Sequence, residues 1–176
     1  IILEELSLSI RSGEKVAFVG ESGCGKSTLV KLLIGLLKYN SGHISLDGVE
    51  LKEICLNSLY SKISYLSQES PVFDGTIREN LVFDRVVSDD ELQSVLKQVQ
   101  LLELLKSTEK GLDTEIGERG TLLSGGEKQR LALARLWFEE PAIVILDEAT
   151  SAMDNLTEES VMKEVINKLK DQTVIA

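Results

Sequence analysis

The segment GESGCGKST at positions 20–28 combines glycines, a lysine and hydroxyl side chains in the order that a triphosphate-binding loop requires. Glycines let the backbone curl until successive N–H groups point at phosphate oxygens, and a helix starting here adds the positive end of its dipole. Lys26 would then reach the β- and γ-phosphates, and the Ser27 hydroxyl would coordinate Mg²⁺. The predicted nucleotide-binding residues of this segment are Gly20, Glu21, Ser22, Gly23, Cys24, Gly25, Lys26, Ser27 and Thr28.

Two acidic residues, Asp147 and Glu148, follow an aliphatic run at positions 142–146. In a doubly wound sheet the ligand lies at the carboxyl ends of the strands, where these side chains would stand. Asp147 would hold Mg²⁺, directly or through water, and Glu148 would polarise the water that attacks the γ-phosphate. Gln68 follows another strand-like run and is predicted to reach the same metal or the attacking water with its amide oxygen. Alone, each residue would be an ordinary polar residue at a turn; beside a phosphate loop they indicate a catalytic site.

A second glycine pair opens another helix, in the sequence LSGGEKQR at positions 123–130. Ser124 would cap this helix, Glu127 would complete a capping box, and the amides of Gly125 and Gly126 would be free to bind a further negative group. An ordinary helix N-cap is the alternative for such a sequence met alone. In a chain that already has one phosphate loop, a second phosphate-binding helix start far along the sequence suggests that two subunits share the nucleotide.

Strand-like and helical segments alternate around these motifs. Strands are expected at 3–10, 15–20, 43–46, 62–66, 142–146 and 173–175, and helices at 29–37 and 157–170. Between residues 69 and 140 the pattern is helical, with a capping-box sequence at Ser88 and Glu91 before apolar residues at helical spacing. This order predicts an α/β fold with a mainly parallel sheet, a small antiparallel part and an inserted helical subdomain. The expected division is a nucleotide-binding core at 1–68 and 141–176, with the helical subdomain at 69–140.

The composition limits the class of protein. With 176 residues, 43% of them hydrophobic, the chain has enough apolar material for a globular core. Its formal charge of -10 argues against a nucleic acid or an anionic membrane as the main partner. No apolar run approaches the roughly 20 residues that cross a bilayer, so this segment is expected to be soluble. Cys24 and Cys55 form neither a close pair nor a metal-binding spacing, which fits a reducing compartment.

Together these motifs resemble the nucleotide-binding domain of an ABC transporter, over nearly the whole chain and in the family's order. The matching segments are 20–28 for the Walker A motif, Gln68 for the Q-loop, 123–130 for the signature, 143–148 for Walker B and 151–154 for the D-loop. The D-loop match adds Asp154 to the predicted cofactor-binding residues. The segments at 75–80 and 114–120 resemble exporter-type members. The resemblance implies a P-loop NTPase (RecA-like) core that hydrolyses ATP with Mg²⁺ as cofactor.

The resemblance also implies partners. Two such domains, identical or different, would meet head to tail, with each ATP between the Walker A loop of one and the signature helix of the other. Ser124 and the Gly126 amide would then contact the γ-phosphate bound by the partner. Residues around Phe73 and at 115–120 would contact the coupling helices of a transmembrane domain, so that ATP powers transport from the cytoplasmic face of a membrane. No nucleic acid partner is expected.

Two elements typical of the family are not found in this sequence. The aromatic residue that stacks on adenine and the switch histidine are missing, and His43 is interpreted as an ordinary strand residue. Both ends fall within strand-like runs, which is typical of a domain cut from a longer chain before the switch histidine. A P-loop kinase or GTPase would share the Walker A motif but not the signature. A soluble ABC-type ATPase, or an ATP-binding dimerisation module with little hydrolysis, would share both motifs.

Overall fold

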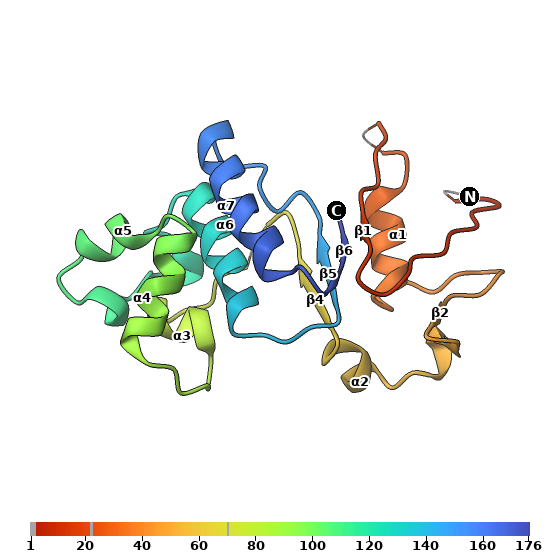
Figure 1. The fold of residues 1–176 in the computed structure, drawn as a ribbon, viewed down its shortest axis with the longest axis horizontal. Coiled ribbons are helices and arrows are strands. Elements are labelled where there is room, and N and C mark those ends of the chain that lie inside the picture. Colours follow the sequence, from red (N-terminus) through yellow and green to blue (C-terminus); the bar gives the residue numbers. More distant parts are fainter. Residues whose placement is uncertain (1–2, 22, 70) are drawn as a thin grey trace. The chain divides into compact units, whose positions relative to one another are not determined.

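The computed structural model describes residues 3–21, 23–69 and 71–176. Its contacts divide the chain into two compact units. The first unit consists of Ile1–Tyr65, Pro141–Asp147 and Asp171–Ala176, and the second consists of Leu66–Glu140 and Glu148–Lys170. Figure 1 labels the helices and strands of both units.

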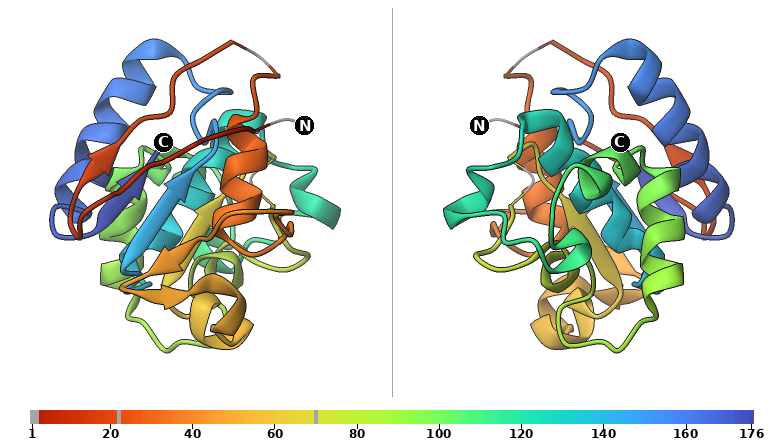
Figure 2. Two further views of the ribbon diagram at one scale, coloured as in Figure 1. Left: turned by 90° about the vertical axis from the view of Figure 1, so that its right-hand side faces the viewer. Right: turned by 90° about the vertical axis from the view of Figure 1, so that its left-hand side faces the viewer.

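A four-stranded sheet with the order β1-β6-β5-β4 forms the centre of the first unit. Its strands are Lys15–Val16 (β1), Thr173–Ile175 (β6), Ile143–Leu146 (β5) and Ile63–Leu66 (β4). Strand β6 pairs in parallel with both neighbours, so that Val174 lies opposite Lys15 on one side and Val144 on the other. Figure 2 shows β5 and β6, in blue tones, side by side. Isoleucine and valine dominate β5 and β6, which is typical of strands that are covered on both faces.

Two helices and a hairpin complete the first unit. Helix α1 (Lys26–Leu33) follows the phosphate loop, and helix α2 (Leu56–Tyr60) precedes β4. The strands β2 (Ser45–Leu46) and β3 (Val49–Glu50) pair antiparallel, and a 3₁₀ turn (Leu51–Glu53) follows them. The turn residues Asp47 and Gly48 both have positive φ, as the tight hairpin connection requires. The buried core of this unit contains Val30, Ile34, Leu51, Leu59, Ile63, Ile145 and Ile175.

The second unit is helical. Its helices are α3 (Ile77–Val82), α4 (Asp89–Gln98), α5 (Leu102–Lys106), α6 (Gly125–Ala134) and α7 (Asn155–Lys168), with 3₁₀ turns at Gly111–Asp113, Glu118–Gly120 and Arg135–Trp137. Side chains with no exposed surface form its core, among them Leu81, Leu92, Val99, Leu133, Leu136, Val161 and Val165. Burial of this apolar surface is the main force that holds the short helices together. Within the described ranges, every helix falls short of the length and hydrophobicity that a membrane crossing needs.

The predicted fold class is confirmed. The sheet is parallel where β6 pairs with its neighbours, the small antiparallel part is the β2–β3 hairpin, and the helical region is present. The division into 1–68, 69–140 and 141–176 stays a prediction. The contacts place α7, which belongs to the last of these segments, in the helical unit.

The strand expected at residues 3–10 is not formed, although all eight residues are described. Leu6 and Leu8 are 54% and 55% exposed, so the alternating leucines meet no buried face. Alternation produces a strand only where a neighbouring strand supplies hydrogen bonds and another layer covers the apolar side. The strand expected at 15–20 is likewise reduced to the two residues of β1.

Two helices end earlier than their apolar patterns predict. Helix α1 stops at Leu33, because Gly35 turns the chain with a φ of 74°. Helix α4 stops at Gln98, and Gln100 takes a φ of 56°, so the apolar periodicity continues into the separate helix α5. At its start the Glu91 N–H donates to Ser88 Oγ at 3.3 Å, which is one half of the predicted capping box. The return bond from the Ser88 N–H to the Glu91 carboxylate is not among the described hydrogen bonds.

Candidate nucleotide-binding and catalytic site

The phosphate loop of the first unit joins β1 to α1. Gly25 is the N-cap of α1, its φ is 106°, and no described side chain caps this helix start. A residue with a Cβ is strained at such a φ, and uncapped N–H groups in a first helical turn are the groups that bind anions. Gly20 is limited in size as well, since a Cβ there would lie 2.7 Å from Cys24 Sγ. The loop therefore has the backbone that a phosphate needs.

Lys26 reaches back over this loop. Its Nζ donates to the carbonyl oxygens of Gly20 at 2.6 Å and Glu21 at 3.0 Å, and lies 3.9 Å from Cys24 Sγ. The ammonium group is thus held beside the uncapped start of α1, where it adds a full positive charge to the helix dipole. The remaining predicted residues of the loop are an exposed Gly23, a half-buried Thr28 within α1, and Ser22, which lies outside the described residues.

Ser27 and Asp147 face one another in the first unit. The Ser27 hydroxyl lies 3.5 Å from Asp147 Oδ1, at the long limit of a hydrogen bond, and Tyr65 donates its hydroxyl to Asp147 Oδ2 at 3.2 Å. Burial, together with the charge and hydrogen bond of Asp147, raises the pKa of Tyr65 to about 12. Tyr65 therefore keeps its proton and donates a hydrogen bond to the carboxylate. Tyr65 was not predicted from the sequence. Its position near the end of β4 is the only sequence feature that points to such a contact.

The side chains of Ser27 and Asp147 fit a magnesium ion. Both offer oxygen donors, which Mg²⁺ prefers, and their loose 3.5 Å contact leaves each oxygen available to a ligand. Among the described residues no group of three or more histidine, cysteine and acidic side chains is placed to hold a metal. A site with few protein ligands suits Mg²⁺, which takes one or two carboxylates and completes its octahedron with phosphates and water.

Gln68 and Glu148 meet in the second unit. Gln68 Nε2 donates to Glu148 Oε2 at 2.8 Å, and both side chains are exposed. The backbone of Glu148 has a φ of 51°, a left-handed conformation that is uncommon outside glycine. Because the amide nitrogen of Gln68 donates to the Glu148 carboxylate, the amide oxygen of Gln68 remains available as an acceptor. The structure therefore brings the two predicted catalytic residues together.

The capping box predicted at the start of α6 is formed. Ser124 Oγ accepts from the Glu127 N–H at 3.3 Å, and Glu127 Oε2 accepts from the Ser124 N–H at 2.7 Å. The glycines that follow lie against the loop before α7. A Cβ on Gly126 would come within 3.0 Å of the Ala152 carbonyl oxygen, and one on Gly125 within 3.3 Å of the Ala152 Cβ. Both glycines therefore favour close packing as well as an accessible helix start.

Asp154 is the N-cap of α7. Its Oδ1 accepts from the Thr157 N–H at 3.0 Å, and hydrogen bonding to the Thr157 side chain, followed by this backbone bond, lowers the pKa of the Asp154 carboxyl group. The residue therefore carries a negative charge at the positive end of a helix dipole. Its predicted part in nucleotide binding stays a prediction.

A buried polar network surrounds Arg135 and was not predicted from the sequence. The guanidinium donates to the Asn80 carbonyl oxygen at 2.7 Å and to the Pro71 carbonyl oxygen at 2.8 Å, and burial lowers the pKa of Arg135 to about 10. Asn80, only 1% exposed, in turn accepts from the Phe73 N–H and donates to the Phe73 carbonyl. Such a network depends on residues that are distant in sequence, and the polar Asn80 beside the apolar residues Leu81 and Val82 is the only local signal.

An exposed aromatic pair lies on this network. The rings of Phe73 and Phe83 are 5.6 Å apart in an edge-to-face arrangement, and the Arg135 guanidinium lies 5.4 Å from each ring centroid. Phe73 is 52% exposed and Phe83 is 47% exposed. Two large aromatic side chains held rigidly at the surface are typical of an interaction site.

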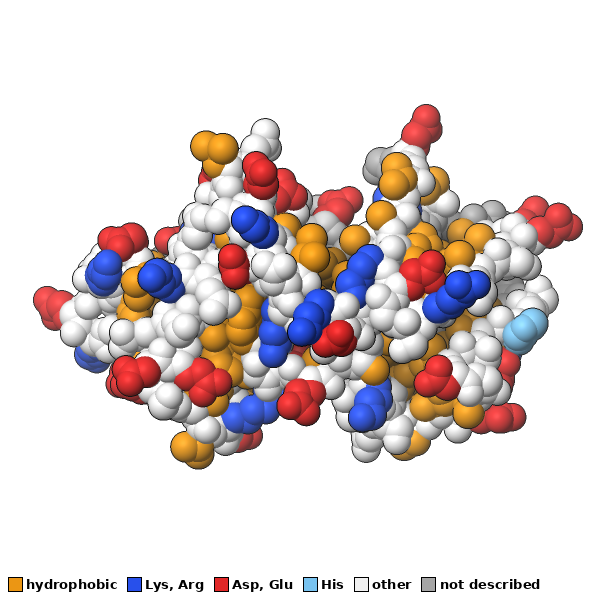
Figure 3. Space-filling model, in the orientation of Figure 1, with side chains coloured by type: hydrophobic (Ala, Val, Ile, Leu, Met, Phe, Trp, Pro, Cys, Tyr) orange, Lys and Arg blue, Asp and Glu red, His pale blue; other side chains and the backbone are white. Residues whose placement is uncertain are grey.

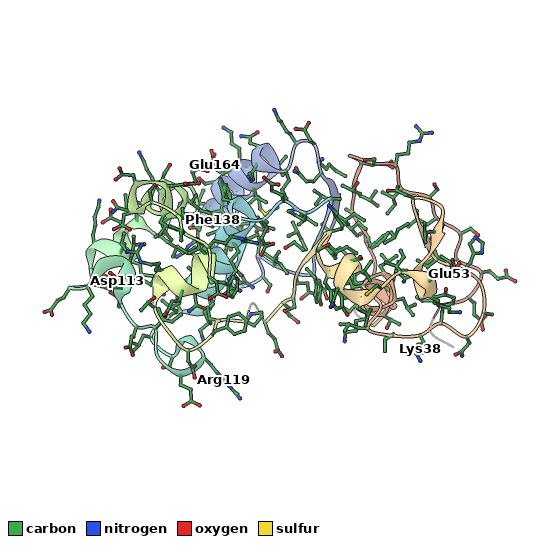
Figure 4. The ribbon with its side chains drawn as sticks, turned by 90° about the horizontal axis from the view of Figure 1, so that it is seen from below. Lys38, Glu53, Asp113, Arg119, Phe138 and Glu164 are labelled. Carbon is green, nitrogen blue, oxygen red and sulfur yellow. The ribbon has the colours of Figure 1, made fainter. Side chains whose placement is uncertain are left out.

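The segment at 114–120 is fastened to the chain just after Phe73. Thr76 and Glu115 form an antiparallel bridge, the Ile116 N–H donates to the Gly75 carbonyl at 3.0 Å, and the Arg119 N–H donates to Asp74 Oδ1 at 2.9 Å. The side chain of Arg119 points outward from its loop in Figure 4. The two segments that were predicted to contact coupling helices are therefore joined to each other.

Acidic and basic side chains are interspersed on the face shown in Figure 3. Two of the described ion pairs share one guanidinium in the helical unit, where Arg78 contacts Asp89 at 2.6 Å and Asp113 at 2.8 Å. Arg78 lowers the pKa of the Asp89 carboxyl group by its hydrogen bond. The charge distribution does not alter the assignment of the site.

Comparison with known proteins gives consistent matches. A family model described as "ABC transporter" matches residues 3–151. The chain is 47% identical over 163 residues, 92% of its length, to an uncharacterised ABC transporter ATP-binding protein of Bacillus subtilis. It is 44% identical over 97% of its length to a mitochondrial iron-sulfur clusters transporter of Candida albicans. A bacterial Atm1-family ABC exporter solved with ATP bound matches 99% of the chain at 36% identity, with a TM-score of 0.91. The chain spans 28%, 23% and 31% of these three proteins.

Proposed function

This chain belongs to the ABC transporter family, and we propose that it is the ATP-hydrolysing domain of an exporter, working as a head-to-tail pair with a second such domain. ATP binding and the exporter-type domain follow from the family. The roles of individual residues, the metal, the partner domain and the membrane domain form the proposal. One observation carries it: an uncapped, glycine-rich helix start, Lys26 above it, and the Ser27–Asp147 pair lie together in one unit.

In the proposed binding step, the loop at 20–28 receives the β- and γ-phosphates of ATP on its N–H groups. Lys26 exchanges its contacts with the loop carbonyls for contacts with phosphate oxygens, which are stronger acceptors because they are charged. Ser27 and Asp147 would hold Mg²⁺, which neutralises negative charge as the phosphate bond breaks. Tyr65 keeps Asp147 in place through its hydrogen bond.

In the proposed hydrolysis step, Glu148 accepts the proton of the attacking water. Gln68 orients the carboxylate through the 2.8 Å hydrogen bond and offers its amide oxygen to the same water. Water attacks the γ-phosphorus, the bond to the β-phosphate oxygen breaks, and ADP and phosphate leave. Charge that develops on the phosphoryl oxygens is met by Lys26 and the loop N–H groups.

The second half of each site is proposed to come from the partner domain. Ser124 and the free amides at the start of α6 form a helix N-terminus suited to an anion. Placed against the γ-phosphate bound by the other domain, this helix start makes closure of the pair depend on ATP. Hydrolysis then removes the link and the pair opens.

Coupling to transport is proposed to occur at the exposed pair Phe73 and Phe83, with the adjoining segment at 115–120. An aromatic surface on a rigid base fits an apolar helix of a membrane domain, and the proposal puts this chain at the cytoplasmic face of a membrane. The relatives include putative multidrug export proteins of Staphylococcus aureus at 43% identity. Their names favour a transporter over a soluble ATPase.

A disulfide experiment on the intact protein tests the head-to-tail arrangement. Cys24 lies on the phosphate loop and is exposed, and Cys55 is the other free cysteine. In a Cys55→Ser background, Ser124→Cys should form an intermolecular disulfide with Cys24 under mild oxidation. The bond should form with ATP and not with ADP, since only ATP joins the two helix starts. A disulfide yield that is equal with both nucleotides, or absent with both, contradicts the proposal.

A further inference from the structure

Gln129 is the most deeply buried polar side chain of α6, at 3% exposure. Its Nε2 donates to Ser151 Oγ at 3.1 Å, and its Oε1 accepts from the Ala152 N–H at 2.8 Å. Burying an amide without such partners is unfavourable, and here both ends of the side chain are satisfied by one short loop. We call these two hydrogen bonds the Gln129 bridge.

Close packing of the glycines supports the bridge independently. Gly126 has little room for a Cβ, because one would lie 3.0 Å from the Ala152 carbonyl oxygen. The first turn of α6 and the residues around Ala152 are thus in direct contact through backbone atoms. Movement of one segment requires movement of the other, because packed interfaces deform little.

The loop reached by the bridge begins at Glu148 and ends at Asp154. It is folded tightly on itself, with the Ser151 N–H donating to the Glu148 carbonyl at 3.2 Å and the Met153 N–H donating to the Thr150 carbonyl at 3.0 Å. The position of Ser151 therefore affects the backbone of Glu148, which already holds a left-handed φ of 51°. No other side chain of α6 makes a described hydrogen bond to this loop.

We propose that Gln129 is a positioning residue that joins the start of α6 to the loop carrying Glu148, so that both move as one piece. The proposal rests on the proposed function. When the α6 helix start meets the partner's γ-phosphate, the bridge sets Glu148 toward the nucleotide of its own chain. Gln129 itself contacts no reacting atom. It makes hydrolysis at one nucleotide depend on the contact made with the other.

The test is Gln129→Met in the intact protein, which keeps the side-chain length and removes both hydrogen bonds. The kcat for ATP hydrolysis should fall about 10-fold or more, because small misplacement of a catalytic group is costly. The control is Gln93→Met, the same replacement at an exposed position of α4, which should leave kcat unchanged. Ser151→Ala removes one bond of the bridge from an exposed residue and should lower kcat less. In the double variant the effects should not add, since both changes break the same contact.

Further readouts separate positioning from folding and from the proposed function. With Gln129→Met, ATP should still drive the disulfide between Cys24 and the cysteine introduced by Ser124→Cys, while hydrolysis falls. Failure of that disulfide in the protein with Gln129 intact overturns the proposed function. A kcat within twofold of the unaltered protein for both Gln129→Met and Ser151→Ala overturns the bridge. If Gln129→Met unfolds the protein, Ser151→Ala decides the matter alone: unchanged kcat refutes the inference, and reduced kcat at unchanged Tm supports it.

Discussion

Gln68 Nε2 donates to Glu148 Oε2 across 2.8 Å, which joins the second residue after β4 to the second residue after β5. The carboxylate of an exposed glutamate would otherwise sample several rotamers. Held in one orientation, it presents its other oxygen and needs little rearrangement before it accepts a proton. Substitution of Glu148 therefore tests the proposed chemical step.

Glu148→Gln should lower kcat for ATP hydrolysis by about 100-fold or more, because an amide is no proton acceptor of comparable strength. ATP binding should persist, since the phosphate loop and Lys26 are unchanged. Steady-state hydrolysis and equilibrium binding of a fluorescent ATP analogue measure the two quantities. Glu159→Gln, an exposed position of α7, is the matched control. Loss of nucleotide affinity together with kcat would show that the glutamate serves binding instead.

ATP should slow the alkylation of Cys24 by a free reagent, because the nucleotide and the partner's helix start would cover the loop, while leaving that of Cys55 unchanged. Both thiols are exposed, but only Cys24 lies on the phosphate loop, 3.9 Å from Lys26 Nζ. Mass spectrometry after brief treatment with iodoacetamide measures both sites in one sample, so Cys55 is an internal control. Equal protection of the two cysteines, or no protection of Cys24 at saturating ATP, would contradict nucleotide binding at residues 20–28.

Tyr65 should make the fold sensitive to alkaline pH. The pKa of Tyr65 is raised to about 12 in the folded chain from an ordinary value near 10, so the folded state holds the proton more tightly. This stabilisation is fully present below pH 10 and is lost as pH rises through 12. Between pH 9.5 and 11.5 the free energy of unfolding should therefore fall more for the unaltered chain than for Tyr65→Phe. The difference should be on the order of 1 kcal/mol after allowance for solvent screening.

Urea titrations at the two pH values measure this difference. Tyr60→Phe is the control, because Tyr60 is exposed and contributes no described hydrogen bond. An equal pH dependence in Tyr65→Phe and the unaltered chain would show that Asp147 is not held by the Tyr65 hydroxyl.

Arg135→Met should destabilise the chain by about 2 to 3 kcal/mol. The substitution keeps much of the side-chain volume but leaves the carbonyl oxygens of Asn80 and Pro71 without their donor. Urea unfolding measures the loss, with Arg85→Met at an exposed position as the control. Accessibility of Phe73 to limited proteolysis should rise as well, since Asn80 fixes the Phe73 backbone. Equal free energies of unfolding for the two variants would show that the hydrogen bonds of Arg135 do not stabilise the fold.

Local chemistry explains what could be predicted from the sequence. The turn at Gly25, the capping box at Ser124 and Glu127, and the acidic pair after β5 depend on neighbouring residues, so their types and spacing indicate them directly. The fold class followed from the order of apolar runs and was confirmed. The individual roles of the site residues stay predictions.

Tertiary contacts explain what could not. Gln129, Tyr65 and Arg135 acquire their roles from partners between 22 and 82 positions away, and their residue types alone are ordinary. The strand expected at residues 3–10 was wrong for the same reason, because an alternating pattern does not say whether a neighbouring strand is there to pair with it.

The left-handed backbone at Glu148 has a consequence for how the protein can change. A glycine at position 148 would relieve roughly 1 kcal/mol of backbone strain and make the fold more stable. The same replacement would delete the carboxylate to which the proposed mechanism assigns proton transfer. If Glu148 has that role, stability and activity make opposite demands on the residue at this one position.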